Sequence, residues 1–267
     1  MAKGNAIVGQ SGGPTSVINS SLAGIVQGCC EVADISRVLG MRWGIEGFMA
    51  DLLVDLSAQS AETIEGLRRT PSSALGSSRY KLQDPDCPKI LAQLERHDIR
   101  TIFMIGGNDT MDTMHRLTAF AAGEGDELRG VGVPKTVDYD IYATDHTPGY
   151  PSAARYTALT VQQSGRLARD MQKVDQFTIY QSIGRDAGWL SAAAALAKRS
   201  DEDAPHLVYM PERHFDKDQF LADVADVFDR FGYVSIVCGE GIKYADGTPV
   251  SATQATDQFA NVEFGAM

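Results

Sequence analysis

The sequence predicts an α/β protein in which helices cover both faces of mainly parallel sheets. Short runs of β-branched and apolar residues alternate with longer amphipathic segments along the 267 residues, and this alternation is typical of βαβ units. Glycine-rich breaks follow several of the predicted strands. Because open parallel sheets bind ligands at the carboxyl ends of their strands, these breaks are candidate binding sites.

The first half of the chain contains four predicted strands. Residues 5–9 form a short apolar strand that the Gln-Ser-Gly-Gly-Pro-Thr segment ends, and residues 17–30, rich in small apolar side chains, predict a helix. A strand at 35–39 precedes a glycine-punctuated loop through Trp43, Gly44 and Gly47. The pattern then predicts a helix at 87–97, a buried strand at 101–105, a helix ending near 122 and a strand at 130–133.

The second half repeats the alternation. A long helix at 152–171 is predicted first, because Pro151 suits the start of a helix. The remaining elements are a strand at 177–182, a helix at 189–198, a strand at 206–210, a helix at 216–231 and a strand at 233–238.

Composition excludes several classes of protein. Hydrophobic residues at 43% and charged residues at 22% are close to the globular average. The net charge of -11 argues against a nucleic-acid partner, since such binding depends on cations that neutralise backbone phosphates. Apolar runs fall short of the ~20 residues that cross a bilayer, and the N-terminus lacks a signal-peptide pattern. We therefore expect no membrane partner and a cytoplasmic location, where the four cysteines stay reduced.

Two glycine-rich breaks suggest phosphate binding. Gly12 and Gly13 let the backbone approach an anion, although a Gly-Gly turn taken alone is more typical of a tight strand-to-helix connection. The Gly-Gly-Asn-Asp-Thr segment at 106–110 adds an amide, Asn108, and a carboxylate, Asp109. A carboxylate beside a phosphate site suits Mg²⁺. The alternative is a helix N-cap formed by Asp109 or Thr110.

The segment at 134–140 carries the strongest catalytic pattern. In an extended segment Asp138 and Asp140 fall on one face, where repulsion tends to raise one pKa, and Lys135 supplies a compensating charge. One carboxylate then suits a general base and the other a metal anchor. A solvated acidic turn is the alternative.

Two arginines and a glutamate complete the candidates. Arg79 and Arg185 follow small residues that give a phosphate access to the guanidinium, although either alone is typical of a surface arginine. Glu240 lies between two glycines after an apolar strand, where its carboxylate can accept sugar hydroxyls.

Six segments in this order resemble the motifs of the phosphofructokinase family, specifically its pyrophosphate-dependent branch. They are Gln-Ser-Gly-Gly-Pro-Thr at 10–15, Gly-Ser-Ser-Arg at 76–79, Gly-Gly-Asn-Asp-Thr at 106–110, Pro-Lys-Thr-Val-Asp-Tyr-Asp at 134–140, Ile-Gly-Arg-Asp-Ala-Gly-Trp at 183–189 and Gly-Glu-Gly at 239–241. The resemblance implies two Rossmann-like three-layer αβα lobes with mainly parallel sheets. A phosphate-donor domain would span 1–150 and a sugar-phosphate domain 151–255, and 256–267 would start a shortened return segment.

The resemblance also implies an activity and its residues. It implies phosphoryl transfer from pyrophosphate to the 1-hydroxyl of fructose 6-phosphate with Mg²⁺, by a chain that forms a homodimer or homotetramer. Asp138, the matching base, would act with Lys135 and Asp109, which stand where ATP-using members carry glycine. The donor contacts would be Gly12, Gly13, Arg79 and Asn108; the sugar-phosphate contacts Thr136, Asp138, Asp140, Ile183, Gly184, Arg185 and Glu240; and the metal contacts Asn108, Asp109 and Asp140.

The sequence departs from the family pattern at several positions. Tyr139 replaces the usual asparagine, Asn108 a common aspartate, Ile183 a methionine and Gln176 a cation, and family members continue beyond residue 267. Three alternatives follow: a phosphofructokinase-like binding or regulatory protein without turnover, an ATP-dependent 6-phosphofructokinase, or a nicotinamide-dinucleotide kinase that shares the Gly-Gly-Asp-type turn.

Overall fold

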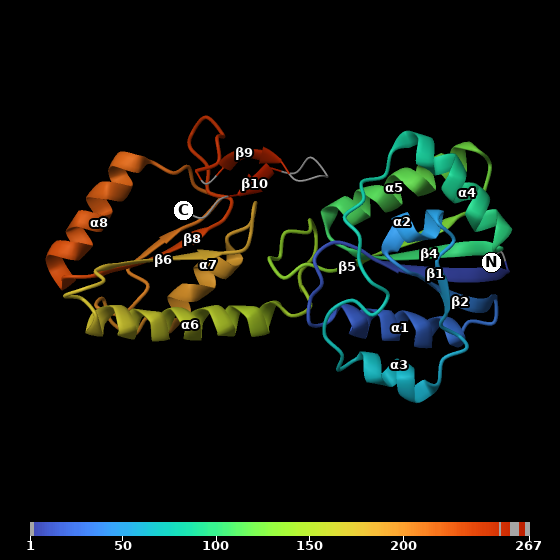
Figure 1. Cartoon of the computed structure of the whole chain (residues 1–267), viewed down its shortest axis with the longest axis horizontal. Helices are drawn as coiled ribbons and strands as arrows, with labels where there is room; N and C mark the ends of the chain where they lie inside the picture. The colour runs from blue at the N-terminus through green and yellow to red at the C-terminus, as the bar shows by residue number, and fades with distance from the viewer. Residues whose placement is uncertain (1–2, 251, 257–261, 265–267) are drawn as a thin grey trace. The chain divides into compact units, whose positions relative to one another are not determined.

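The computed structural model describes residues 3–250, 252–256 and 262–264 (Figure 1). The chain divides into two compact units, 1–136 and 137–267. The expected return segment at 256–267 falls mostly outside the described residues. None of the described helices is both long enough and apolar enough to cross a bilayer.

A five-stranded sheet forms the centre of the first unit. Its strands are β1 (Gly4–Gln10), β2 (Ile35–Met41), β3 (Leu53–Asp55), β4 (Ile99–Gly106) and β5 (Arg129–Pro134), in the order β3-β2-β1-β4-β5. All neighbours pair in parallel except β2 and β3. The carboxyl ends of β1, β4 and β5 therefore lie next to one another at one edge of the sheet.

Helices cover both faces of this sheet (Figure 1). On one face, α1 (Ile18–Cys30) and α3 (Ala61–Leu67) bury Leu22 and Ile64 against Val8 of β1. On the other, α2 (Gly44–Met49), α4 (Cys87–Arg96) and α5 (Asn108–Gly123) pack around Ile7, with a short 3₁₀ helix, Asp84–Asp86, before α4. Neighbouring residues of β1 thus enter opposite cores, as strand geometry requires.

The second unit repeats the layering on a smaller sheet. Its parallel strands are β6 (Phe177–Ser182), β7 (Leu207–Tyr209) and β8 (Val234–Gly239), in the order β6-β8-β7. On one face, α6 (Tyr150–Asp170) and the 3₁₀ helix Ala194–Ala197 pack on Val237, and α7 (Trp189–Ala193) buries Leu190 and Ala193 against Ala154 of α6. On the other, α8 (Lys217–Phe231) packs on Val234 and Ile236. Strands β9 (Ala252–Thr256) and β10 (Val262–Phe264) form a separate antiparallel pair.

The structure confirms the predicted α/β class and its two mainly parallel sheets. The loop predicted through Trp43, Gly44 and Gly47 is wrong, because α2 forms there and buries Ile45 and Phe48. A Cβ at Gly47 would collide with the carbonyl oxygen of Arg42. That glycine allows a close backbone approach rather than marking a loop. The helix predicted at 189–198 divides into α7 and a 3₁₀ turn.

Candidate functional site

The carboxyl ends of β1, β4 and β5 meet at Lys135. The backbone N–H of Lys135 donates to the carbonyl of Gly106 at 2.9 Å, and its Nζ donates to the carbonyl of Gly13 at 2.7 Å. Only 8% of Lys135 is exposed. A Cβ at Gly12, whose φ is +76°, would lie 3.2 Å from this Nζ. The lysine charge is therefore fixed beside a turn in which both the backbone and the space favour glycine.

The segment before Arg79 is hydrogen-bonded to this glycine turn. Gly12 donates its N–H to the carbonyl of Ser78 at 3.1 Å, and Ser77 Oγ donates to the carbonyl of Gly12 at 2.5 Å. A Cβ at Gly13 would lie 3.9 Å from the Arg79 guanidinium. The first unit thus brings Gly12, Gly13, Lys135 and Arg79 together, although they come from three segments of the chain.

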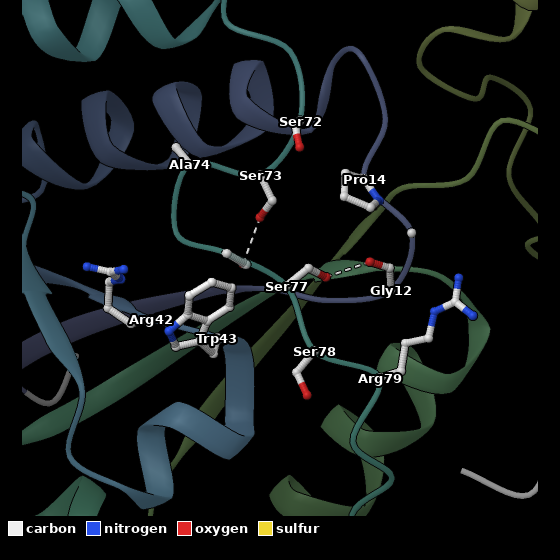
Figure 2. A pocket seen from close by; sticks show the side chains of 12 residues that line it. Gly12, Pro14, Arg42, Trp43, Ser72, Ser73, Ala74, Ser77, Ser78 and Arg79 are labelled. Atoms are coloured by element: carbon white, nitrogen blue, oxygen red, sulfur yellow. Dashed lines mark hydrogen bonds between the residues drawn. The ribbon is translucent and has the colours of Figure 1, made fainter. Parts of the chain in front are cut away.

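An open pocket of about 490 Å³ lies along this turn (Figure 2). Figure 2 shows Arg42 and Trp43 at one side, and Gly12, Pro14 and Arg79 at the other. The wall between them comes from Ser72 to Ser78. Trp43 is 48% exposed, and a Cβ at Gly76 would lie 2.5 Å from its ring. Guanidinium groups and hydroxyls therefore share the pocket with an aromatic face.

Two buried amides that the sequence analysis missed support the pocket wall. Gln10 and Asn19 are fully buried, and Gln10 Nε2 donates to Asn19 Oδ1 at 2.9 Å. Gln10 Oε1 accepts from Ser73 Oγ at 2.8 Å and from the N–H of Leu75 at 3.0 Å. Asn19 Oδ1 accepts from the N–H of Ala74 at 2.9 Å. The amide pair thus ties the ends of the glycine turn to the 73–75 wall.

A sequence signal for these amides did exist. Gln10 ends a strand whose residues 6–9 are all small or apolar, and Asn19 lies in a helix rich in small apolar residues. Buried polar side chains are nearly always hydrogen-bonded. A polar residue on a predicted core face therefore indicates a partner, although the sequence does not identify which one.

Asn108 and Asp109 lie in the exposed first turn of α5. The N-cap of α5 is Gly107, without a side-chain cap, so the alternative that Asp109 or Thr110 forms the cap is wrong. Thr110 is buried instead and packs on Gly106. Among the residues described here, no cluster of three or more histidine, cysteine, aspartate or glutamate side chains is placed to hold a metal. Mg²⁺ needs fewer protein ligands than such a cluster provides, because it takes one or two carboxylates and completes its shell with phosphate oxygens and water.

The segment from Thr136 to Asp140 is not extended. Thr136 ends the first unit, the chain bends at Val137 and Asp138, and Tyr139 has a left-handed φ of 63°. The expectation that Asp138 and Asp140 share a face of an extended segment is therefore wrong. At this bend the Tyr139 ring contacts the rings of Tyr150 and Trp189, and strand periodicity does not take such contacts into account.

The second unit collects the candidate sugar-phosphate residues where β6 and β8 end. Gly184 donates its N–H to Glu240 Oε1 at 3.3 Å, and Arg185 Nε lies 4.0 Å from the same oxygen. A Cβ at Gly184, whose φ is +126°, would lie 3.8 Å from the Asp138 Cβ. Ile183, beside them, is half exposed. Asp138 and this loop are thus neighbours within one unit.

Comparison with known proteins identifies the relatives. The phosphofructokinase family model matches residues 5–264. The pyrophosphate--fructose 6-phosphate 1-phosphotransferases of Rhodospirillum rubrum and Xanthomonas campestris are 41% and 40% identical over 94% and 100% of the chain. The chain spans 61% and 65% of their lengths. A pyrophosphate-dependent phosphofructokinase from Nitrosospira multiformis superimposes with a TM-score of 0.82 and 36% identity, over 91% of this chain and 62% of that one.

Proposed function

The chain belongs to the phosphofructokinase family, and we propose that it transfers a phosphoryl group from pyrophosphate to the 1-hydroxyl of fructose 6-phosphate. The product would be fructose 1,6-bisphosphate. The observation that carries this proposal is the Lys135 ammonium, fixed on the Gly13 carbonyl in a chain whose net charge is -11. Local positive charge of this kind is what an inorganic diphosphate requires.

The first unit supplies residues suited to the donor. Backbone at Gly12 and Gly13 lets phosphate oxygens approach closely, while Lys135 and Arg79 neutralise their charge. Because Lys135 is already buried and hydrogen-bonded, little reorganisation is needed as charge moves to the leaving group.

The second unit supplies residues suited to the acceptor. Ile183, Gly184 and Arg185 would bind the sugar phosphate, with Glu240 accepting sugar hydroxyls. The 1-hydroxyl oxygen attacks the terminal phosphorus, the bridging P–O bond breaks, orthophosphate leaves, and Asp138 accepts the hydroxyl proton. Thr136 and Asp140, on either side of Asp138, would complete these contacts.

Mg²⁺ is the expected cofactor, with Asn108, Asp109 and Asp140 as its predicted ligands. Bound there, the ion would neutralise phosphate charge and orient the transferring group. The exposed Asp109 carboxylate offers the hard oxygen ligand that Mg²⁺ prefers.

A coupled assay with fructose 6-phosphate and Mg²⁺ tests the proposal when pyrophosphate and ATP are compared as donors. We expect product with pyrophosphate and none with ATP. Asp138→Ala should lower kcat by roughly 10²-fold or more, since general base catalysis contributes about 10²–10⁴-fold. Asp145→Ala, an exposed carboxylate in the same loop, is the matched control and should keep full activity. Undiminished turnover in Asp138→Ala would refute its role.

A nucleotide donor is the alternative that the pocket supports. Trp43 is half exposed in a space of about 490 Å³, and such a ring can stack on a base. Transfer from ATP but not from pyrophosphate would establish this alternative.

A binding or regulatory role is the other alternative, because Tyr139 and Gln176 depart from the family pattern. Calorimetric measurement of fructose 6-phosphate binding would distinguish this role from catalysis. Fructose 6-phosphate that binds without transfer from either donor would replace the enzymatic proposal with this one.

A further inference from the structure

Tyr139 adopts a backbone conformation that tyrosine rarely takes. Its φ of 63° lies in the left-handed region, which costs free energy for every residue with a bulky side chain. Strained residues of this kind persist where surrounding contacts hold them, often next to functional groups. Tyr139 directly follows Asp138, so contacts that hold Tyr139 also constrain the backbone of Asp138.

Two aromatic rings hold the Tyr139 side chain. Its ring centroid lies 5.4 Å from that of Tyr150 and 5.5 Å from that of Trp189, with an interplanar angle of 79° to the Trp189 ring. Tyr150 also donates its hydroxyl to the carbonyl of Trp189 at 3.1 Å. Edge-to-face pairs at such distances are favourable beyond the area that they bury. The three rings therefore form one cluster, the Tyr139 clamp.

The Tyr139 clamp connects three segments of the second unit. Tyr150 begins α6, Trp189 begins α7 directly after the glycine-rich loop, and Tyr139 lies at the bend. Val137 and Tyr150 also pack on Ala154 and Leu190, buried residues of α6 and α7. The bend thus packs against both α6 and α7.

We propose that Tyr139 is a positioning residue for Asp138. With its ring held by Tyr150 and Trp189, the bend keeps the Asp138 side chain against Gly184, where a Cβ would lie 3.8 Å from the Asp138 Cβ. Tyr139 acts through Asp138 and not on the reacting atoms. The inference rests on the proposed function, because it presumes that Asp138 is the base.

Two substitutions in the full chain distinguish the effect of the Tyr139 ring from the effect of its backbone conformation. Tyr139→Asn suits the left-handed conformation but removes the ring, whereas Tyr139→Phe keeps the ring and removes only the hydroxyl. We expect Tyr139→Asn to lower kcat by roughly 10²-fold, the loss typical of a catalytic group displaced by about 1 Å. The KM for pyrophosphate should not change, and the acidic limb of the pH–rate profile should move.

The control positions are matched. Tyr139→Phe should retain the kcat and pH profile of the unmodified chain. Tyr142→Asn removes a tyrosine that is 97% exposed in the same loop, and it should also have no effect. Equal losses in Tyr139→Phe and Tyr139→Asn, or full activity in Tyr139→Asn, would overturn the proposal.

Fluorescence provides a measurement that does not need turnover. The chain has two tryptophans, so Trp43→Phe leaves Trp189 as the single emitter. In that background, Tyr139→Asn should shift Trp189 emission to the red and increase quenching by acrylamide, while Tyr139→Phe should not. Unchanged emission in Tyr139→Asn would rule out the clamp. A clamp that behaves as expected in a chain without turnover would instead reject the proposed function.

Discussion

Lys135 and Arg79 bring positive charge to the same glycine turn in different ways. Lys135 is buried and donates to the Gly13 carbonyl, so its ammonium is held in place before any ligand binds. Arg79 is exposed, and solvent and salt weaken its attraction to an anion. A preorganised charge stabilises a developing charge better than a mobile one. In the proposed reaction, Lys135 would therefore contribute more than Arg79 to stabilising the leaving group.

His206 makes the stability of the second unit depend on pH. Its Nδ1 accepts from the N–H of Ser235 at 2.9 Å, and its Nε2 donates to the carbonyl of Glu202 at 3.1 Å, an arrangement that requires the neutral ring. Burial, more than the nearby charges of Lys198 and Arg230, lowers the pKa of His206. Protonation of Nδ1 would break the bond to Ser235.

The sign of the pH effect follows from the lowered pKa of His206. As pH falls below about 6.5, His206 becomes protonated in the unfolded chain before it does in the folded chain. The free energy of unfolding that is present at neutral pH therefore decreases as pH falls towards the lowered pKa of His206 in the folded chain. Urea unfolding at pH 7.5 and 5 should show a steeper loss for the unmodified chain than for His206→Gln. The difference should reach at most ~1.4 kcal/mol per pH unit. Equal slopes would contradict this role for His206.

At the scale of elements, the sequence predicted best those strands and helices whose own residue periodicity is enough to identify them. Strands such as β1 and β4 and the long helix α6 were predicted to within a few residues, because each is a continuous apolar or amphipathic run. It failed at α2, where Gly44 and Gly47 serve close packing, and at Tyr139, where ring contacts from α6 and α7 impose a left-handed turn. Both depend on distant residues that a local pattern does not contain.

The candidate residues show the same limit. The glycine turns and Lys135 were recognisable because their residue types suit phosphate. Gln10 and Asn19 instead bond to each other and to residues 73–75, which lie more than 50 positions away in the sequence. Their support of the pocket wall depends on the three-dimensional fold, which brings these distant residues together.

The Gln10–Asn19 pair yields a prediction for the β1–α1 connection. Gln10→Leu keeps a similar volume but leaves the buried N–H of Leu75 without its acceptor, whereas Ser73 Oγ can still donate to the carbonyl of Gly76 at 2.7 Å. Each buried group left without a partner costs about 1–3 kcal/mol, so the free energy of unfolding should fall by at least that amount. Pyrophosphate should also bind more weakly, because the 73–75 wall loses its anchor.

Urea titration and calorimetry with pyrophosphate measure these two effects of Gln10→Leu. Gln59→Leu, at an exposed glutamine, is the matched control and should change neither quantity appreciably. Stability and affinity that stay unchanged in Gln10→Leu would mean that the wall does not depend on the amide pair.

At the scale of the whole molecule, charge and apolar surface act in opposite directions. A net charge of -11 opposes association between copies of the chain, yet large apolar side chains of the second unit remain exposed. Leu196 is 78% exposed, and with Leu159 of α6 it borders an apolar pocket of about 420 Å³. Apolar patches of this kind mark interaction surfaces in soluble proteins.

Self-association, expected as a homodimer or homotetramer, is therefore open to a direct test by sedimentation velocity. We expect the unmodified chain to sediment as a dimer or larger species, because burying Leu159 and Leu196 removes apolar area from water at about 25 cal/mol per Å². Leu196→Arg places a charge in that surface and should shift the chain towards the monomer. Gln219→Arg adds the same charge to the exposed side of α8 and should not. A monomeric unmodified chain would refute association, and equal effects of both arginines would assign it to net charge instead of this surface.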